Sequence, residues 1–523
     1  MTHSKIFPGA PAVHHQSSRR LFMRQASALS LAAGAGAPLA LNLLAAGSAA
    51  AQSAGDYRAI VCLFMFGGND TYNMVLPTDS ASWTAYTAMR SSIALLPPGT
   101  PPNPGAGAGS AARLGGVLPI APANPQGRTY ALHPLMTRLQ SMFDTDRRLA
   151  VVANIGPLVA PTTKAQYSTP AHPRPPRLFS HNDQQSTWQT MLPEGATQGW
   201  GGRIADMVVG GNTRAVFTAI SASGGAVWLS GQSVRQYQVS GAGALRLGAN
   251  SNNRVYDSAA VATALASIAR SAQGSHVLEA DVAATAARSI DAESLLRDAL
   301  RPASDPAFGT PPAGSASYNP SADPKLQYIS PANGNPVFSP LAQQLQMVAR
   351  LVQAGVSGAT GVRRQVFFVS LGGFDTHSNQ NPQHADLMAR VAHALQYFDT
   401  ALGAINARAH VTTFTASDFG RTFTSNGDGT DHGWGAHQFV MGGAVRGGDL
   451  YGTFPRLVAR STGSNEFDSP DQLRNGALLP STSVDQLGAT LGRWFGLSDG
   501  QALEVFPNLA NFNAGARNLG FMA

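Results

Sequence analysis

The sequence predicts an α/β protein built on a mostly parallel sheet. Short apolar runs at residues 58–66, 149–155, 365–371 and 410–416 are typical of buried strands, and helical patterns lie between them. Strands that alternate with helices form parallel sheets covered by helices on both faces. Three of these runs are followed by an aspartate, so we expect polar chemistry at the carboxyl ends of the strands, where ligands bind in such sheets.

The first 51 residues have the pattern of a twin-arginine export signal. Ser18-Arg19-Arg20-Leu21-Phe22 precedes an uncharged run rich in Ala, Leu and Gly, and Ala49-Ala50-Ala51 is a small-residue cleavage pattern. A membrane anchor is the alternative, but the run is weakly apolar and contains Pro38. We expect the twin-arginine translocase to export the chain and cleavage to follow Ala51, which gives a periplasmic or secreted protein.

Removal of this segment lowers the formal charge from +7 to +3, because it holds four basic residues and no acidic one. No dense Lys or Arg run remains, so we expect no nucleic-acid partner. No later run is long and apolar enough to span a bilayer, so we expect no stable membrane insertion after cleavage. Cys62 is the single cysteine, so no intramolecular disulfide can form, and it lies in an apolar predicted strand.

Residues 52–523 are expected to form a single domain with long loops. The first strand, at 58–66, ends in Gly67-Gly68-Asn69-Asp70, and helices are predicted near 80–89 and 134–143 before the second strand. Connectors rich in Pro, Gly, Ala and Ser, most clearly 97–127 and 303–340, are predicted to be surface loops.

The middle of the chain is predicted to be an insertion or lid, at about 203–340. It has short β-like pieces at 215–220 and 226–229, followed by Ala-rich helical patterns from 255 to 300. We find no cluster of charged residues or histidines between 203 and 302, so a structural role is the preferred interpretation.

The last part repeats a helix–strand unit. A helix over 341–353 leads to the strand that precedes Asp375, and a helix over 384–405 leads to the strand that precedes Asp418. Three carboxylates at one sheet edge, Asp70, Asp375 and Asp418, would repel one another unless a divalent cation neutralised them. The sequence therefore predicts a metal site.

Histidines near these aspartates favour one metal class over another. His377 follows Asp375 by two residues, and His432 and His437 follow the third strand within a short distance. Mixed oxygen and nitrogen ligands suit zinc, manganese or iron better than calcium. A lone aspartate at a strand end is usually a turn or cap residue, so the prediction depends on the joint pattern.

A serine nucleophile is predicted between the first and second aspartates. Ser180, in Phe179-Ser180-His181-Asn182-Asp183, could sit at the start of a helix, where backbone N–H groups favour an anion and a nearby metal favours the alkoxide. A plain N-cap role for Ser180 or Asn182 is the alternative, and the residues alone leave the two open.

Five ordered motifs also carry a resemblance. They are Gly-Gly-Asn-Asp at 67–70, Phe-Ser-His-Asn-Asp-Gln at 179–184, Gly-Gly-Phe-Asp-Thr-His at 372–377, Ser-Asp-Phe-Gly-Arg-Thr at 417–422 and Asp-His-Gly-Trp-Gly-Ala-His at 431–437. Together they resemble domain-of-unknown-function family 1501, a group of exported bacterial proteins. More distantly the chain resembles the alkaline phosphatase superfamily of phosphatases, sulfatases and phosphoglycerate mutases. That resemblance implies a three-layer α/β/α sandwich with two metals.

The resemblance implies a role for each motif. Asp70 and Asp418 would bind one metal, with Ser180 as the bridging nucleophile, while Asp375, His377 and His432 would bind the other. We prefer His432 to His437 because of its spacing to the following strand. The remaining candidates for substrate contacts or for support of the ligands are His133, His181, Arg421 and His437.

Departures from the superfamily pattern leave the metal open. Its usual aspartate–histidine pair is Asp418-Phe419 here, and Asp375 and His377 are unusually close in sequence. One or two divalent ions, zinc or manganese, are expected.

Three functions follow from the sequence. The first is a metal-dependent hydrolase of a small anionic phosphate or sulfate ester. The second is a catalytically degenerate, metal-stabilised binding or assembly protein. The third, a serine hydrolase with an elbow at Gly496-Leu497-Ser498-Asp499-Gly500, is disfavoured because this match follows a helix-like stretch and no histidine lies after His437.

Overall fold

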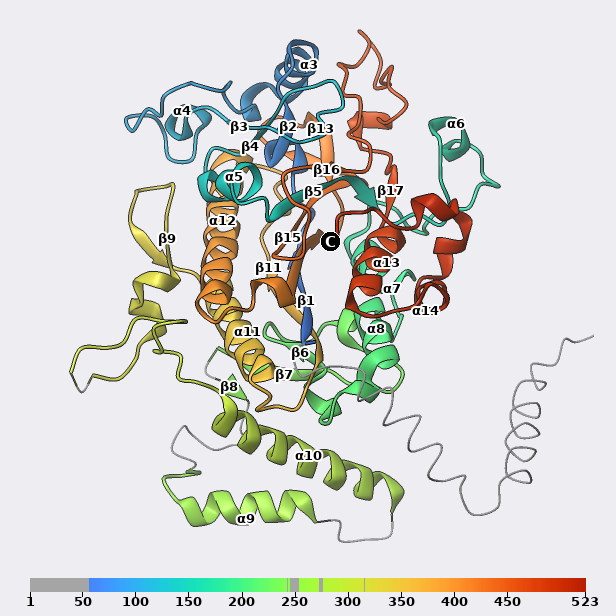
Figure 1. Cartoon of the computed structure of the whole chain (residues 1–523). Coiled ribbons are helices and arrows are strands. Elements are labelled where there is room, and N and C mark those ends of the chain that lie inside the picture. Colours follow the sequence, from blue (N-terminus) through green and yellow to red (C-terminus); the bar gives the residue numbers. More distant parts are fainter. Residues whose placement is uncertain (1–55, 242, 245–253, 272–275, 315) are drawn as a thin grey trace, which may run out of the picture. The chain divides into compact units, whose positions relative to one another are not determined.

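A ten-stranded sheet lies at the centre of the protein in a computed structural model (Figure 1). The structure describes residues 56–241, 243–244, 254–271, 276–314 and 316–523. The predicted export signal, residues 1–51, lies outside the described residues. Residues 57–523 form one compact unit.

The strand order brings the three predicted strand ends together. Along the sheet the strands are β16 (Leu450–Tyr451), β5 (Leu149–Gly156), β15 (Ala436–Gly442), β12 (Val411–Ser417), β1 (Arg58–Met65), β11 (Arg364–Leu371), β6 (Ala219–Ser221), β7 (Tyr237–Ser240) and β8 (Gly243–Ala244), and β17 (Thr482–Ser483) pairs with β5. Neighbours run parallel, except that β15 is antiparallel to β12 and β5 and β8 is antiparallel to β7. The mostly parallel α/β sheet predicted from the sequence is confirmed.

Helices cover both faces of this sheet. One face carries α5 (Thr137–Asp144), α11 (Pro340–Val356) and α12 (Gln380–Ala404). The other carries α7 (His181–Thr190), α8 (Trp200–Val208), α13 (Val484–Phe495) and α14 (Asp499–Val505). Figure 1 shows the two groups on opposite sides of β1, so the architecture is a three-layer sandwich.

The residues of β1 explain why its sequence is almost continuously apolar. Val61 and Leu63 pack in the core beneath α11 and α12, while Ile60, Cys62 and Phe64 pack in the core on the other face. A strand buried on both faces needs an apolar side chain at every position, not at alternate ones.

Smaller elements surround the sandwich. They are α3 (Ser80–Arg90), α4 (Ala111–Leu114), α6 (Lys164–Tyr167), the helices α9 (Ala259–Arg270) and α10 (Val277–Ala299), the small sheet of β2 (Val75–Pro77), β4 (Tyr130–Leu132) and β3 (Leu118–Ile120), and the hairpins β9 (Gln327–Ile329) with β10 (Pro336–Phe338) and β13 (Arg421–Ser425) with β14 (Thr430–His432). Among the described residues, no helix has the length and apolar character to cross a membrane.

Two predicted β-like pieces of the middle region differ from the structure. Residues 226–229 contain a 3-10 turn, Val227–Leu229, because Trp228 packs edge-on against Trp200 and its backbone N–H donates to Gln189. The piece at 215–220 is a 3-10 turn, Ala215–Phe217, followed by β6. The predicted Ala-rich helices are present as α9 and α10.

The sequence disfavours the serine-hydrolase elbow because it follows a helix-like stretch, and the structure confirms that context. Ser498 follows α13 and caps α14 through a reciprocal hydrogen-bond pair with Gln501. A nucleophile elbow needs a strand before the serine.

Candidate metal centre

Three neighbouring parallel strands end at the same level of the sheet. Met65 of β1 lies in register with Leu371 of β11 on one side and with Ser417 of β12 on the other. Asp375 and Asp418 follow within a few residues, and the segments after β1 and β12 pair through Asn69 and Gly420. The carboxyl ends of the strands therefore converge as the sequence predicts.

One group of possible ligand atoms forms at this edge, from His181, Asp375 and His432. His181 Nε2 lies 3.4 Å from Asp375 Oδ2, and His432 Nε2 lies 3.4 Å from Asp375 Oδ1. His377 adds a further nitrogen, because its Nε2 lies 3.0 Å from both Asp375 Oδ1 and His432 Nε2. The group can hold a metal ion.

Hydrogen bonds to Nδ1 orient two of these histidines. His181 Nδ1 lies 2.8 Å from Asp418 Oδ2, and His432 Nδ1 lies 2.7 Å from the carbonyl oxygen of Phe179. Since carboxylate and carbonyl oxygens can only accept, Nδ1 carries the hydrogen in both rings. In the neutral form of this tautomer, the lone pair of Nε2 is free to bind a metal, as in metal-binding histidines.

The spacing of these atoms fits a small divalent cation. Zinc bonds of 2.0–2.1 Å give ligand–ligand distances of about 3.3 Å in a tetrahedron. His377 Nε2 and His432 Nε2 lie 3.0 and 3.4 Å from Asp375 Oδ1 and 3.0 Å from each other, close to this spacing. His181 Nε2 lies 3.4 Å from the other oxygen, Oδ2, and the ligand atoms of His181, Asp375 and His432 all lie within 4.8 Å of one another. Moreover, His181 Nε2 is buried and has no hydrogen-bond partner among the described residues, which is the state of an unfilled ligand atom.

Charge around the group favours an ionised Asp375. Burial raises the pKa of its carboxyl, but Arg421, whose Nη2 donates to Oδ1 at 2.7 Å, outweighs burial and the pKa is lowered. The hydrogen bond to Asp418 raises the pKa of His181, whereas burial lowers that of His432. A carboxylate anion and a neutral imidazole are the forms that bind metals, so the shifts of Asp375 and His432 favour metal binding, and a cation at His181 would have to displace a proton.

A family model described as "Protein of unknown function (DUF1501)" matches residues 57–506. The chain belongs to the DUF1501 family. The match spans all five motifs that carry the resemblance.

The solved structures that align with this chain are only distantly similar to it. The crystal structure of Ps i-CgsB in complex with k-i-k-neocarrahexaose aligns at a TM-score of 0.32 and 8% identity, over 88% of this chain and 77% of that chain. Ps i-CgsB in a second crystal structure aligns at 0.31 and 8%, over the same shares. Likenesses this low carry no argument about activity. No curated protein matches the chain.

In this DUF1501 protein, Asp70 lies outside the His181, Asp375 and His432 group. Its buried carboxylate forms an ion pair with Arg90, which is also fully buried, and accepts from Gln380 Nε2 and the backbone N–H of Tyr72. Burial raises the pKa of Asp70, and Arg90 and Arg421 oppose the rise. Its predicted metal role stays a prediction, since both oxygens already accept.

Asp418 lies behind His181. Its Oδ2 accepts from His181 Nδ1 and Gln185 Nε2 at 2.8 Å each and from the backbone N–H of Gly67 at 3.1 Å. Its Oδ1 is buried without a hydrogen-bond partner among the described residues. The carboxylate therefore orients a histidine that faces the group.

Arg421 contacts Asp375 from the hairpin of β13 and β14. It is the first residue of β13 and lies opposite His432 of β14 in the register. Besides its bond to Asp375, the fully buried guanidinium has two nitrogens, Nε and Nη1, without a hydrogen-bond partner in the described part of the chain. Arg421 therefore holds Asp375 in place.

Ser180 occupies the N-cap position of α7, directly before His181, but its side chain does not cap the helix. Its hydroxyl donates instead to Asp183 Oδ2 at 3.0 Å. That bond joins a hydroxyl to a carboxylate able to accept its proton.

The other two predicted histidines lie apart from the group. His437 is buried on β15, where Nδ1 accepts from the backbone N–H of Asn154 and the ring stacks on Phe454. His133 is buried beside His384, and its Nδ1 accepts from the backbone N–H of Leu135. Burial lowers the pKa of both histidines, to about 3 for His437.

Phe419 directly follows Asp418 and lies between two histidines of the group. Its ring is buried and packs against His181 at 4.8 Å and His432 at 4.7 Å between ring centroids. Phe419 therefore supports two histidines without supplying a ligand. Within the described residues, a single group of three or more possible ligands forms, so the structure offers one candidate metal centre.

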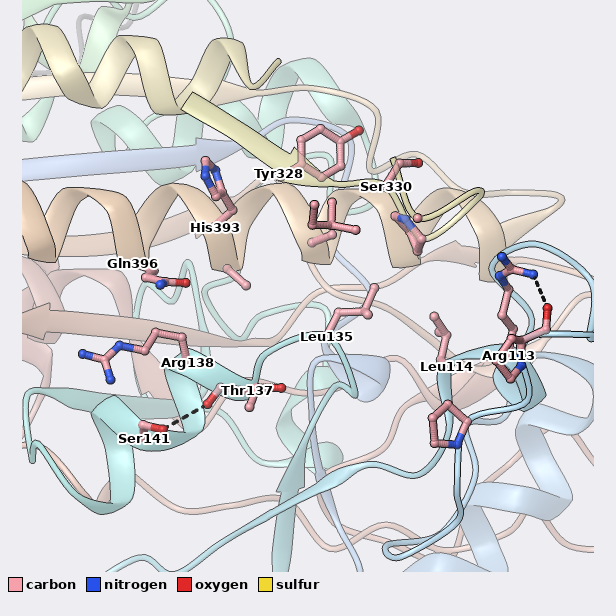
Figure 2. A pocket seen from close by; sticks show the side chains of 17 residues that line it. Arg113, Leu114, Leu135, Thr137, Arg138, Ser141, Tyr328, Ser330, His393 and Gln396 are labelled. Carbon is pink, nitrogen blue, oxygen red and sulfur yellow. Dashed lines mark hydrogen bonds between the residues drawn. The ribbon is translucent and has the colours of Figure 1, made fainter. Parts of the chain in front are cut away.

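Two cavities flank the sandwich. A cavity of about 680 Å³ lies between α5, α12 and the turn after β9, and Figure 2 shows Arg138, Tyr328 and His393 on its walls. A cavity of about 420 Å³ lies in the segment before α7, and one of its lining residues is Phe179, whose carbonyl oxygen accepts from His432.

Proposed function

We propose that this protein is a metal-dependent hydrolase of phosphate or sulfate esters. The observation that carries the proposal is the convergence of His181 Nε2 and His432 Nε2 on Asp375. Ser180 directly precedes His181 in the chain, and its hydroxyl donates to Asp183. Zinc or manganese fits a site with imidazole and carboxylate ligands. The distant resemblance to the alkaline phosphatase superfamily supports the same chemistry.

The chain's own residues divide the work as follows. His181, Asp375 and His432 would hold one divalent cation, with His377 as a fourth ligand, and Asp418 and Arg421 would keep these side chains in place. A bound cation supplies positive charge that stabilises the oxyanions of the ester in the transition state.

Ser180 would attack the phosphorus or sulfur atom. Its proton passes to Asp183, a bond forms from Oγ to the ester centre, and the alcohol oxygen leaves and takes up a proton. Water then hydrolyses the intermediate and restores Ser180, so that one ester and one water give an alcohol and an acid.

The test combines metal analysis with hydrolysis of aryl phosphate and aryl sulfate panels. We expect the purified chain to hold about one zinc or manganese, and Asp375→Ala to lose the metal and at least about 100-fold in kcat/KM. Ser180→Ala should keep the metal and lose turnover. Asp291→Asn, an exposed aspartate on α10 paired with Arg270, is the matched control. Metal-free wild type without activity on either panel would overturn the proposal.

A second function is favoured by Phe419. The replacement of a superfamily ligand by a buried phenyl ring supports a protein that keeps a metal for stability and binds a partner in the cell envelope without turnover. A metal-loaded chain that is inactive on both panels but loses several degrees of Tm in Asp375→Ala would favour this function over the hydrolase.

Export through the twin-arginine route is part of the proposal. The substrate is then a small anionic ester outside the cytoplasm, and no nucleic acid is bound. Replacing Arg19 and Arg20 by lysine should retain the protein in the cytoplasm, as fractionation would report; unchanged export would contradict this route.

A further inference from the structure

The cavity before α7 is formed almost entirely by one segment of the chain. Its volume is about 420 Å³, within the range of small-ligand sites. The walls come from the turn that connects α6 to α7, with Tyr167, Pro170, His172, Arg174, Pro175, Pro176, Arg177, Leu178 and Phe179. Two arginines line it, and among these described residues none is acidic.

Arg174 is positioned without a carboxylate partner. Its Nη1 donates to the carbonyl oxygen of Tyr167 at 2.8 Å, and its guanidinium lies 5.2 Å from the centre of the Tyr167 ring. In the described part of the chain, no acidic side chain lies within ion-pair distance of Arg174. Its positive charge therefore remains available to an anion in the cavity.

Arg177 connects the cavity to the predicted nucleophile. Its Nη1 lies 3.5 Å from Asp183 Oδ1, and the other oxygen of Asp183 accepts from Ser180 Oγ. The Arg177 side chain is 72% exposed, so its ion pair is weak and the guanidinium can turn to a ligand.

Phe179 connects the cavity to the metal centre. Phe179 lines the cavity, and its carbonyl oxygen accepts from His432 Nδ1. Arg177 and Phe179 both have left-handed backbone conformations, with φ of 50° and 72°. Such conformations disfavour bulky side chains and concentrate at ligand sites. Here they lie in the cavity wall, directly before α7 and beside His432.

We propose that this cavity binds a second anionic group of the substrate, such as a carboxylate, sulfate or phosphate. The hydrolysed ester would then be one group of a molecule that carries at least two anions. Arg174 and Arg177 bind the group that stays, and the metal centre binds the group that is cleaved. The assignment of the cleaved group to the metal centre rests on the proposed function.

Calorimetry on the full chain with excess zinc tests the subsite without turnover. The probes are alkylphosphonates and ω-carboxyalkylphosphonates matched in chain length, from 3-phosphonopropionate against propylphosphonate to 6-phosphonohexanoate against hexylphosphonate. At one or more lengths, the carboxylate should tighten binding at least about tenfold, the value of one charge-assisted hydrogen bond. Arg174→Gln should abolish this advantage and leave the plain alkylphosphonate unchanged.

Arg138→Gln, in the larger cavity of Figure 2, is the matched control and should keep the advantage. Equal binding of both probes at every chain length would overturn the subsite, as would an advantage that survives Arg174→Gln. The proposed function fails separately: a chain that hydrolyses no ester but still prefers the carboxylate probe keeps the subsite and loses the hydrolase.

Discussion

Asp70 and Asp375 follow neighbouring parallel strands, each after two glycines and one further residue, yet their surroundings are opposite. Asp70 is fully buried and is paired with a fully buried arginine. The Asp375 side chain is 46% exposed and has three histidine nitrogens within 3.4 Å. One carboxylate is neutralised inside the protein, and the other is partly exposed among histidine nitrogens.

The difference shows that position at a strand end does not determine the role of an aspartate. The role of each aspartate depends on which arginine contacts its carboxylate and how much of the carboxylate that arginine covers. Arg90, at the end of α3, covers Asp70, whereas Arg421 contacts Asp375 through one nitrogen and leaves the carboxylate open to the histidines. The comparison predicts that Asp70 supports stability and that Asp375 supports metal binding.

Removal of the arginine beside Asp70 should have the largest effect. Arg90→Ala leaves a buried carboxylate without its main partner, which costs about 3–5 kcal/mol of unfolding free energy. Urea unfolding of the variant measures this loss. Arg297→Ala removes an i,i+4 pair with Glu293 on α10, in which the arginine side chain is 42% exposed, and should cost about 0.3–0.5 kcal/mol. A loss below about 1 kcal/mol for Arg90→Ala would show that Arg421 alone can neutralise Asp70.

A third aspartate sharpens the comparison, because it is buried and forms no ion pair among the described residues. Asp485 near the start of α13 bonds to Ser483, and burial raises its pKa from 3.8 to about 6. The folded state therefore binds more protons than the unfolded state between these values, and its stability falls as pH rises from about 4 to 6. Two pKa units correspond to about 3 kcal/mol.

Asp485→Asn removes this ionisation. The unfolding free energy of the variant, relative to wild type, should rise by about 3 kcal/mol between pH 4 and pH 7. Denaturant unfolding at several pH values measures the difference. A relative stability that does not change with pH would mean that Asp485 ionises in the folded protein as easily as in water.

The sheet and its strand ends could be predicted from the sequence because buried parallel strands are apolar at every position. β1, β11, β12 and β5 agree with the predicted runs to within about two residues. The 3-10 turn at Val227–Leu229 could not be predicted, since tertiary packing of Trp228 decides a run that short.

The candidate centre was predictable in its residue types but not in its pairing. His181 was expected to support the ligands, and the structure places it within the group, held by a carboxylate 237 residues away. Arg90 carries no local signal, because an arginine in the last turn of a helix usually faces solvent. The Phe179 carbonyl that orients His432 is a backbone group, which any residue could supply.

The smallest expected effect concerns the carboxylate behind His181. Asp418→Asn keeps the shape of the side chain but removes the negative charge that makes His181 a better ligand, so metal affinity should fall about 10–100-fold. Competition with a chromophoric chelator measures this affinity, and thermal unfolding of the metal-free protein separates it from a loss of stability. Asp206→Asn is the control, because that carboxylate accepts from Ser233 and Val234 and contacts no histidine among the described residues. An unchanged affinity in Asp418→Asn would assign Asp418 to the buried class of Asp70, and a complete loss of metal would place it with Asp375 as a ligand in its own right.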